Sequence, residues 1–209
     1  TTPYIAGFFD LGRTGPMVVN VPPGPTGGMA DDFWQRPVAD LGLAGPDKGK
    51  GGKYLFLGPG QKKPANAKVD YVFESGTMNV FFGIRILTTD PKQSKEILEA
   101  FTAYPLANPA KKSRVVDAKG EYFGYQARGL KYWEHLNEIL QREPVAERDR
   151  FMMASLKFLG IEKGKPFNPD ARQKKLLEEA SLVGEAMAQA NSFESRFDGV
   201  KYREDAAWE

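Results

Sequence analysis

The chain has 209 residues and a formal net charge of +2, with 29 Lys and Arg against 27 Asp and Glu. This near balance argues against a nucleic-acid-binding protein, because neutralising many phosphates needs a large, clustered basic excess. Hydrophobic residues make up 41% of the chain and aromatic residues 12%, which excludes compositional disorder. The length suits one large domain, or one and a half.

The first 90 residues alternate between β-rich runs and turns. Residues 22–28 should end the run 16–21, because proline lacks the ladder donor and glycine relaxes the backbone. Residues 29–43 are predicted as a strand or a short irregular segment, and Pro37 argues against a central strand. Strands are expected at residues 4–11, 16–21, 54–57, 71–75 and 78–87.

The run 78–87 shows the clearest strand alternation. Its wholly apolar set, and therefore its predicted core face, is Met78, Val80, Phe82, Ile84 and Ile86. The short Gly76-Thr77 link to the preceding run predicts either a tight hairpin or one bent strand.

Helical periodicity follows. Asp90 and Pro91 supply an N-cap and a proline at the first helical position, and Tyr104-Pro105 should stop that helix. A last hairpin is expected around Lys119-Gly120. Further helices are predicted at residues 130–142, 146–159 and 168–191.

Strands that precede helices favour an α+β fold over a βαβ alternation. We expect an antiparallel sheet or sandwich in the first half and three to four helices in the second. Residues 1–129 would form a β-rich domain, and residues 130–209 a helical segment packed on it. Both ends carry apolar or aromatic residues, so we expect a piece of a longer polypeptide.

The residue inventory limits the chemistry. The chain has no cysteine, so disulfides, thiolate metal sites and cysteine nucleophiles are excluded. Its single histidine, His135, cannot form a site with two histidine ligands. No apolar run approaches the roughly 18 residues of a membrane span. We therefore expect no metal, no cofactor and no membrane span.

Residues 45–53 form a glycine- and lysine-rich loop that fails both nucleotide-binding patterns. The phosphate-binding loop needs Ser or Thr after Gly-Lys, but Tyr54 follows Gly52-Lys53, and a strand rather than a helix comes next. We interpret the loop as a solvated, lysine-bearing turn. The alternative is a mobile loop that closes over an anionic ligand or docks on a neighbouring subunit.

The densest polar and aromatic cluster lies at residues 31–36. On a strand, Asp32, Trp34 and Arg36 would share one face. A structural Asp–Arg ion pair beside the indole is one interpretation, and a ligand site is the other. With Tyr54, these three residues are our candidates for an aromatic-lined ligand site.

His135 lies at the edge of the polar side of the predicted helix 130–142. It is interpreted as a partly exposed histidine near a carboxylate, with a general base as the alternative. The mixed charges of residues 142–150 indicate a solvated, salt-bridged surface, or alternatively an oligomer contact. Ala180, Gly184 and Ala188, spaced by four, would let another backbone approach closely.

Three unusual runs together resemble one bacterial family, the domain of unknown function 1254. They are Val-Pro-Pro-Gly-Pro-Thr-Gly-Gly at 21–28, Asp-Phe-Trp-Gln-Arg at 32–36, and the stretch from Asp40 to Tyr54. The run 160–172 is similar to the helical tail of the same family. The likeness spans about residues 4–197.

The resemblance implies a two-domain protein with a jelly-roll-like second domain, the domain of unknown function 1214, which is missing here. It also implies an exported, periplasmic or secreted protein, and it supplies no catalytic residues. The expected function is a β-rich module in a homo-oligomeric assembly or in ligand binding. The alternative is a hydrolase-like enzyme acting on a small organic substrate. Expected partners are a second copy, the missing second domain and a small organic ligand.

Overall fold

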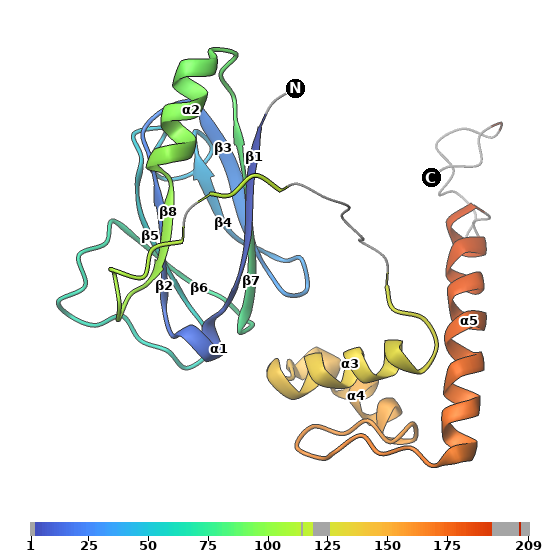
Figure 1. The fold of residues 1–209 in the computed structure, drawn as a ribbon. Coiled ribbons are helices and arrows are strands. Elements are labelled where there is room, and N and C mark those ends of the chain that lie inside the picture. The colour runs from blue at the N-terminus through green and yellow to red at the C-terminus, as the bar shows by residue number, and fades with distance from the viewer. Residues whose placement is uncertain (1–2, 114, 119–125, 194–204, 206–209) are drawn as a thin grey trace. The chain divides into compact units, whose positions relative to one another are not determined.

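The computed structural model describes residues 3–113, 115–118, 126–193 and 205. The chain divides into two compact units, the first made of Thr1–Gly120 with Arg142–Pro144 and the second of Glu121–Gln141 with Val145–Glu209. Figure 1 shows the strands and two short helices in the first unit and the remaining helices in the second. The predicted α+β class is confirmed.

The first unit is a sandwich of two four-stranded sheets. Pairing is antiparallel throughout both sheets except between β5 and β6, which run parallel. One sheet has the order β1 (Tyr4–Asp10), β7 (Asn79–Ile86), β3 (Thr26–Asp32) and β4 (Pro37–Gly42). The other has the order β6 (Tyr71–Glu74), β5 (Gly52–Leu57), β2 (Met17–Val21) and β8 (Thr102–Pro105).

The core lies between the two sheets and follows the predicted alternation of β7. Val80, Phe82, Ile84 and Ile86 are buried, while Met78, just before the strand, is half-buried. The Phe82 ring stacks on Phe9 of β1, with centroids 5.1 Å apart. Stacked aromatic pairs add to the free energy of apolar burial, so this contact helps to fix the register of β1 against β7.

Two predictions about this part of the chain are wrong, whereas the predicted end of the run 16–21 is confirmed, because β2 ends at Val21. Residues 29–43 form a hairpin, and β3 already begins at Thr26, so the Gly-Gly pair at 27–28 lies in a strand. Gly28 belongs there because a Cβ would lie 2.3 Å from the Gly83 oxygen. The Gly76-Thr77 link forms neither a hairpin nor a bent strand, since β6 and β7 belong to different sheets. Pro37 does lie on an edge strand, as its missing donor requires.

Two short helices complete the first unit. Helix α1 (Leu11–Thr14) follows β1, and α2 (Pro91–Ala100) begins after Asp90, whose side chain accepts from the Lys92 amide as predicted. Tyr104-Pro105 does not stop α2, which ends at Ala100; these two residues lie in β8, a strand that the sequence analysis missed. The hairpin expected around Lys119-Gly120 falls on residues outside the described ones.

The second unit contains α4 (Arg150–Lys157), α5 (Ala171–Phe193) and α3 (Leu130–Arg142) except its last residue, which belongs to the first unit. The bounds of α3 agree with the prediction. The third helix is shorter than residues 146–159, because the 3-10 turn η1 (Glu147–Asp149) replaces its first turn. Helix α5 begins after Asp170 rather than Asn168: the Asp170 carboxylate accepts from the Gln173 amide, and the Gln173 side chain accepts from the Asp170 amide.

The second unit has a thin core among its described residues. Leu140, Ile161 and Leu177 are buried, and the Trp133 indole donates to the Leu177 carbonyl at 2.7 Å. Phe158, in contrast, is 89% exposed. The ladder of Ala180, Gly184 and Ala188 is exposed as well, so it packs on no described element. None of the described helices is long and apolar enough to span a membrane.

The close approach of β3 and β7 leads to a first prediction. Replacing Gly28 by alanine should destabilise the protein by about 1–3 kcal/mol, because the new methyl group meets the backbone of β7. Gly184→Ala is the matched control: its Cβ meets nothing within 4 Å, so we expect a gain of about 0.5–1 kcal/mol. Urea unfolding followed by circular dichroism measures both. Equal midpoints for the two variants would contradict the packing described here.

Candidate functional site

Asp32 holds the turn between β3 and β4. One carboxylate oxygen accepts from the Trp34 and Arg36 amides at 2.8 and 3.0 Å, and the other accepts from the Arg36 guanidinium at 2.6 Å. The Asp32 side chain is only 5% exposed, so a single buried carboxylate satisfies three donors of the turn. The predicted Asp–Arg ion pair is present, and it supports the hairpin.

Trp34 and Arg36 do not share a strand face with Asp32, because β3 ends at Asp32 and β4 begins at Pro37. Trp34 is exposed at the turn, and its ring meets Phe33 edge-on with centroids 5.0 Å apart. The Phe33 amide donates to the Thr77 hydroxyl at 2.8 Å. The structure thus brings Asp32, Trp34 and Arg36 together in a tight turn.

Tyr54 lies apart from this turn, in the core. Its hydroxyl donates to Asp47 at 2.6 Å, and the Gly51 amide donates to the other oxygen of the same carboxylate at 2.8 Å. Burial, reinforced by the hydrogen bond and the charge of Asp47, raises the pKa of Tyr54. The glycine-rich loop exposes its lysines, as predicted for a solvated turn, while Asp47, only 2% exposed, fastens the loop to β5.

Glu143 is a buried carboxylate that the sequence analysis missed. It is 1% exposed and accepts from the Met78 and Asn79 amides at 2.6 and 3.0 Å and from the Asn79 side chain at 2.6 Å. The mixed-charge run 142–150 was predicted to be solvated, and exposed pairs such as Arg150–Glu147 agree with that prediction. Glu143 is the exception, and only its position before a proline set it apart in the sequence.

His135 lies exposed on α3, in the second unit, whereas Asp32, Trp34, Arg36 and Tyr54 belong to the first. Among the described residues, no hydrogen bond joins His135 to a side chain that could act as a nucleophile. The described part of the chain also holds no group of three or more acidic or histidine side chains that could bind a metal ion.

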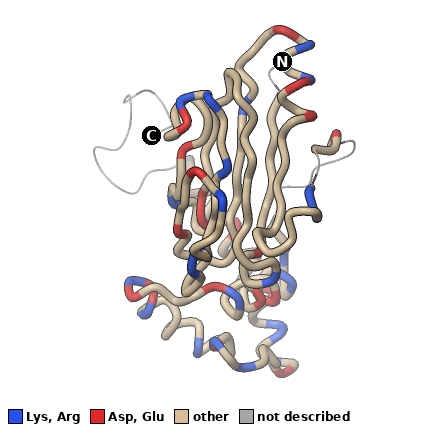
Figure 2. Tube along the Cα trace, turned by 90° about the vertical axis from the view of Figure 1, so that its left-hand side faces the viewer, with Lys and Arg blue, Asp and Glu red and all other residues tan. Residues whose placement is uncertain are grey.

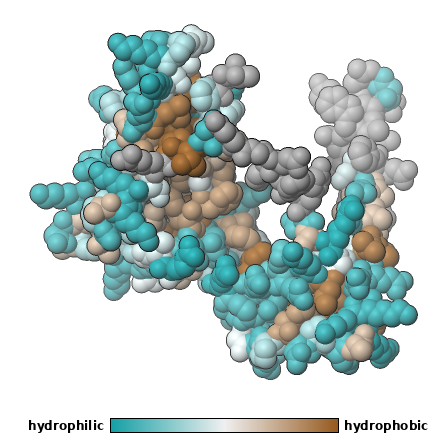
Figure 3. All heavy atoms as spheres, in the orientation of Figure 1, coloured by the Kyte–Doolittle hydropathy of each residue, from teal (hydrophilic) through white to brown (hydrophobic). Residues whose placement is uncertain are grey.

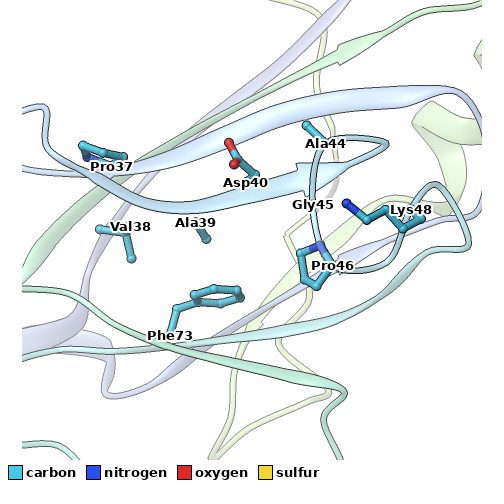
Figure 4. A pocket seen from close by; sticks show the side chains of 9 residues that line it. All are labelled: Pro37, Val38, Ala39, Asp40, Ala44, Gly45, Pro46, Lys48 and Phe73. Atoms are coloured by element: carbon cyan, nitrogen blue, oxygen red, sulfur yellow. The ribbon is translucent and has the colours of Figure 1, made fainter.

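A hollow of about 370 Å³ opens between the edge strands β4 and β6. In Figure 4, Ala39 and Pro46 point toward the Phe73 ring, while the Asp40 carboxylate points away from it. Ligand sites need polar groups that converge on the cavity. The lining of this hollow mixes apolar side chains with Asp40 and Lys48, and neither Trp34 nor Tyr54 lines it.

Strand β1 lies at an edge of its sheet and pairs only with β7 among the described residues. The Pro3 carbonyl accepts from the Ile86 amide, and the Leu11 amide donates to the Met78 carbonyl. Antiparallel ladders alternate, so odd-numbered residues of β1 turn their backbone groups toward β7 and even-numbered ones turn theirs away. Tyr4, Ala6 and Phe8 therefore present unpaired N–H and C=O groups among the described residues.

The outer face of this sheet is rich in aromatic and apolar side chains. Phe8 is 77% exposed and packs against Phe81 of β7 with centroids 5.1 Å apart. The guanidinium of Arg85 lies 5.4 Å from the centre of the Tyr4 ring. Figure 2 shows most charged residues at turns and few along the strands, and Figure 3 shows apolar side chains reaching the surface in both units.

The other sheet edges are protected. Edge strand β4 starts with Pro37 and carries Asp40, β6 has four residues, and β8 pairs with Ser113. Strand β1 has seven residues, no internal proline, no lysine and no bulge. Proteins normally guard such an edge, because it can template pairing with another chain. The candidate functional site is therefore the β1 edge with its aromatic outer face.

The first half of the chain is similar in sequence to a known protein family. The model of a family described as a protein of unknown function, DUF1254, matches residues 1–106, about half of the chain. The chain belongs to this family, as the resemblance in the sequence predicted. The match covers both sheets, including the β1 edge and the Asp32 and Asp47 turns.

The fold is also similar to a solved structure. The crystal structure of the VPA0106 protein from Vibrio parahaemolyticus matches with a TM-score of 0.67 and 18% sequence identity. The match covers 91% of this chain and 48% of that one, so this chain spans about half the length of its structural relative. No curated protein matches the chain in sequence.

Glu143 provides a second prediction. Glu143→Gln should lower the free energy of unfolding by about 1–3 kcal/mol, because its amide nitrogen cannot accept from the backbone donors that the carboxylate satisfies. Glu147→Gln, at a side chain 79% exposed, should stay within about 0.5 kcal/mol. Urea unfolding compares the two. Similar losses in both variants would show that the Glu143 contacts contribute little.

The raised pKa of Tyr54 predicts that the free energy of unfolding depends on pH. Its pKa is raised in the folded protein, so folded Tyr54 keeps its proton above the ordinary tyrosine pKa of about 10, whereas the unfolded chain releases it. The stability that this group contributes is thus present below pH about 10 and is lost as the pH rises further. Urea unfolding between pH 7 and 11 should show a shallower decline for Tyr54→Phe than for wild type. An unchanged slope would contradict this assignment.

Proposed function

We propose that this chain is an assembly module that forms a homodimer by pairing the β1 edges of two copies. The observation that carries the proposal is the long, unguarded β1 edge beside an exposed aromatic face. The side chains of β1 favour a second copy of this chain as the partner over an unrelated strand, because the β1 sequence is complementary to itself in antiparallel pairing.

The alternation of β1 fixes the register of this pairing. Even-numbered residues must face even-numbered residues of the other copy, because their backbone groups point away from β7. Of these groups, the Asp10 carbonyl also accepts from the Thr14 hydroxyl at 2.8 Å. Centring the pair on Gly7 places Ala6 opposite Phe8 of the partner subunit and Tyr4 opposite Asp10 of the partner subunit. This register uses all seven residues of the strand, and registers centred on Ala6 or Phe8 use fewer.

The side chains agree with this register. The exposed Phe8 ring would pack against the small Ala6 of the partner subunit, so that apolar area is removed from water. Arg85 lies over the Tyr4 ring, and Tyr4 would face Asp10 of the partner subunit. An arginine and an aspartate would therefore meet at each end of the paired strands, which favours the antiparallel register.

Ala6→Pro tests the pairing. Proline removes the Ala6 N–H, which points away from β7, so the sandwich keeps its own ladder while the interface loses a donor. We expect wild type to sediment as a dimer and Ala6→Pro as a monomer with an unchanged circular dichroism spectrum. Analytical ultracentrifugation of the full chain over a range of concentrations makes the measurement.

A matched pair of charge variants controls this test. Phe8→Lys should also give a monomer, because lysine on an edge strand disfavours strand pairing and the new ammonium groups of the two copies would repel each other across the interface. Leu87→Lys adds the same charge at a side chain that is 46% exposed and outside β1, so the dimer should persist. A wild-type chain that stays monomeric throughout, or an Ala6→Pro variant that still dimerises, would overturn the proposal.

Export to the periplasm or beyond the cell, and a second domain that completes the protein, stay predictions of the family resemblance. Cell fractionation of the full gene product in a bacterial host would test the first of them. Recovery of the product only in the cytoplasm would contradict it.

A further inference from the structure

A second hollow, independent of the β1 edge, lies on the outer face of the other sheet and has a volume of about 620 Å³. Its floor contains Val18 of β2, Tyr104 of β8 and the adjacent Leu106. Two loops form its walls, the connection from β5 to β6 and the segment after β8, and Figure 1 shows both on the same side of the unit. The volume is in the range of pockets that hold small organic ligands.

Three lysines and no acidic residue line this hollow. Lys53 extends from β5, and Lys62 and Lys68 extend from the connection between β5 and β6. Their ammonium groups make no ion pair with any described residue. The nearby Asp70 carboxylate accepts from the Lys53 backbone amide at 2.8 Å and does not line the hollow. The rim is therefore a cluster of positive charge without an acidic lining residue, above an apolar floor.

Tyr104 adds an available donor. Burial raises the pKa of its hydroxyl, which therefore keeps its proton at neutral pH. Within the described residues the hydroxyl has no hydrogen-bond partner. It can donate a hydrogen bond to an acceptor atom of a ligand.

The walls are held in place before any ligand arrives. The Gln61 side chain donates to the Leu11 carbonyl at 2.7 Å and accepts from the Gly58 amide, which fastens one end of the β5–β6 connection. At the other end, the Asp70 amide donates to the Lys53 carbonyl at 3.0 Å. Between them, Val69 packs on the small apolar cluster under the hollow. Such preorganisation lowers the entropic cost of binding.

We propose that this lysine-rimmed hollow binds a small organic anion with an apolar body, of the chemical class of a medium-chain carboxylate. The apolar part would lie on Val18, Tyr104 and Leu106, and the carboxylate would face Lys53, Lys62 and Lys68. This arrangement divides recognition between apolar burial and charge attraction.

Isothermal titration calorimetry of the full chain tests the proposal with three probes of equal chain length: decanoate, 1-decanol and decyltrimethylammonium. Decanoate should bind at least about tenfold more tightly than either of the others, because three exposed charge contacts together contribute about that factor. Decanoate binding should also weaken as salt concentration rises. Inorganic phosphate should bind more weakly than decanoate, because it has no apolar body.

Two triple variants with the same change in net charge separate the site from the overall charge. Lys53→Gln, Lys62→Gln and Lys68→Gln together should weaken decanoate binding about tenfold. Lys131→Gln, Lys174→Gln and Lys175→Gln, all at exposed positions of the second unit, should leave it unchanged. Absence of decanoate binding, equal binding of decanoate and decanol, or equal losses in the two triple variants would each overturn the proposal.

Discussion

Buried carboxylates that accept backbone N–H groups are the constraint on which this sandwich depends. Wherever the chain leaves a sheet inside the folded unit, its amides lose their ladder partners, and an unpaired buried amide is costly. Asp32 serves the turn from β3 to β4, Asp47 the turn before β5, and Glu143 the passage from one sheet to the other. Each does so with two oxygens that satisfy several donors at once.

This structural role argues against an acid–base role for the acidic residues Asp32 and Asp47. A carboxylate beside an aromatic ring is a common signature of acid–base chemistry, and Asp32 with Trp34, or Asp47 with Tyr54, would fit that description. In this structure their oxygens already bind amides, a guanidinium or a phenol at 2.6–3.0 Å. The groups that remain available lie on the outside of the sandwich, as free backbone at β1 and as ammonium groups over the opposite sheet.

The parts of the fold that could be predicted are those with a clear periodic pattern of apolar residues. The alternation in β7 and the amphipathic pattern of α3 each have one strong apolar face, so burial decides both structure and orientation. The hairpin of β3 and β4 could not be seen that way, because Gly27 and Gly28 carry no side chain to mark a face. The candidate site was missed for a related reason. Whether a strand lies at the edge of a sheet depends on the topology of the whole sheet. The residues of β1 alone do not show that no second strand pairs with it on its outer side.

The parallel pairing of β5 and β6 has an evolutionary consequence. Two parallel neighbouring strands cannot be joined by a tight turn. The chain must instead return along the length of the sheet before the second strand can begin. That return path is residues 58–70, and it carries two of the three rim lysines. Evolution can thus change the length and the charge of this connection while the strands that it joins stay the same. Relatives with one common scaffold could in this way come to hold quite different molecules.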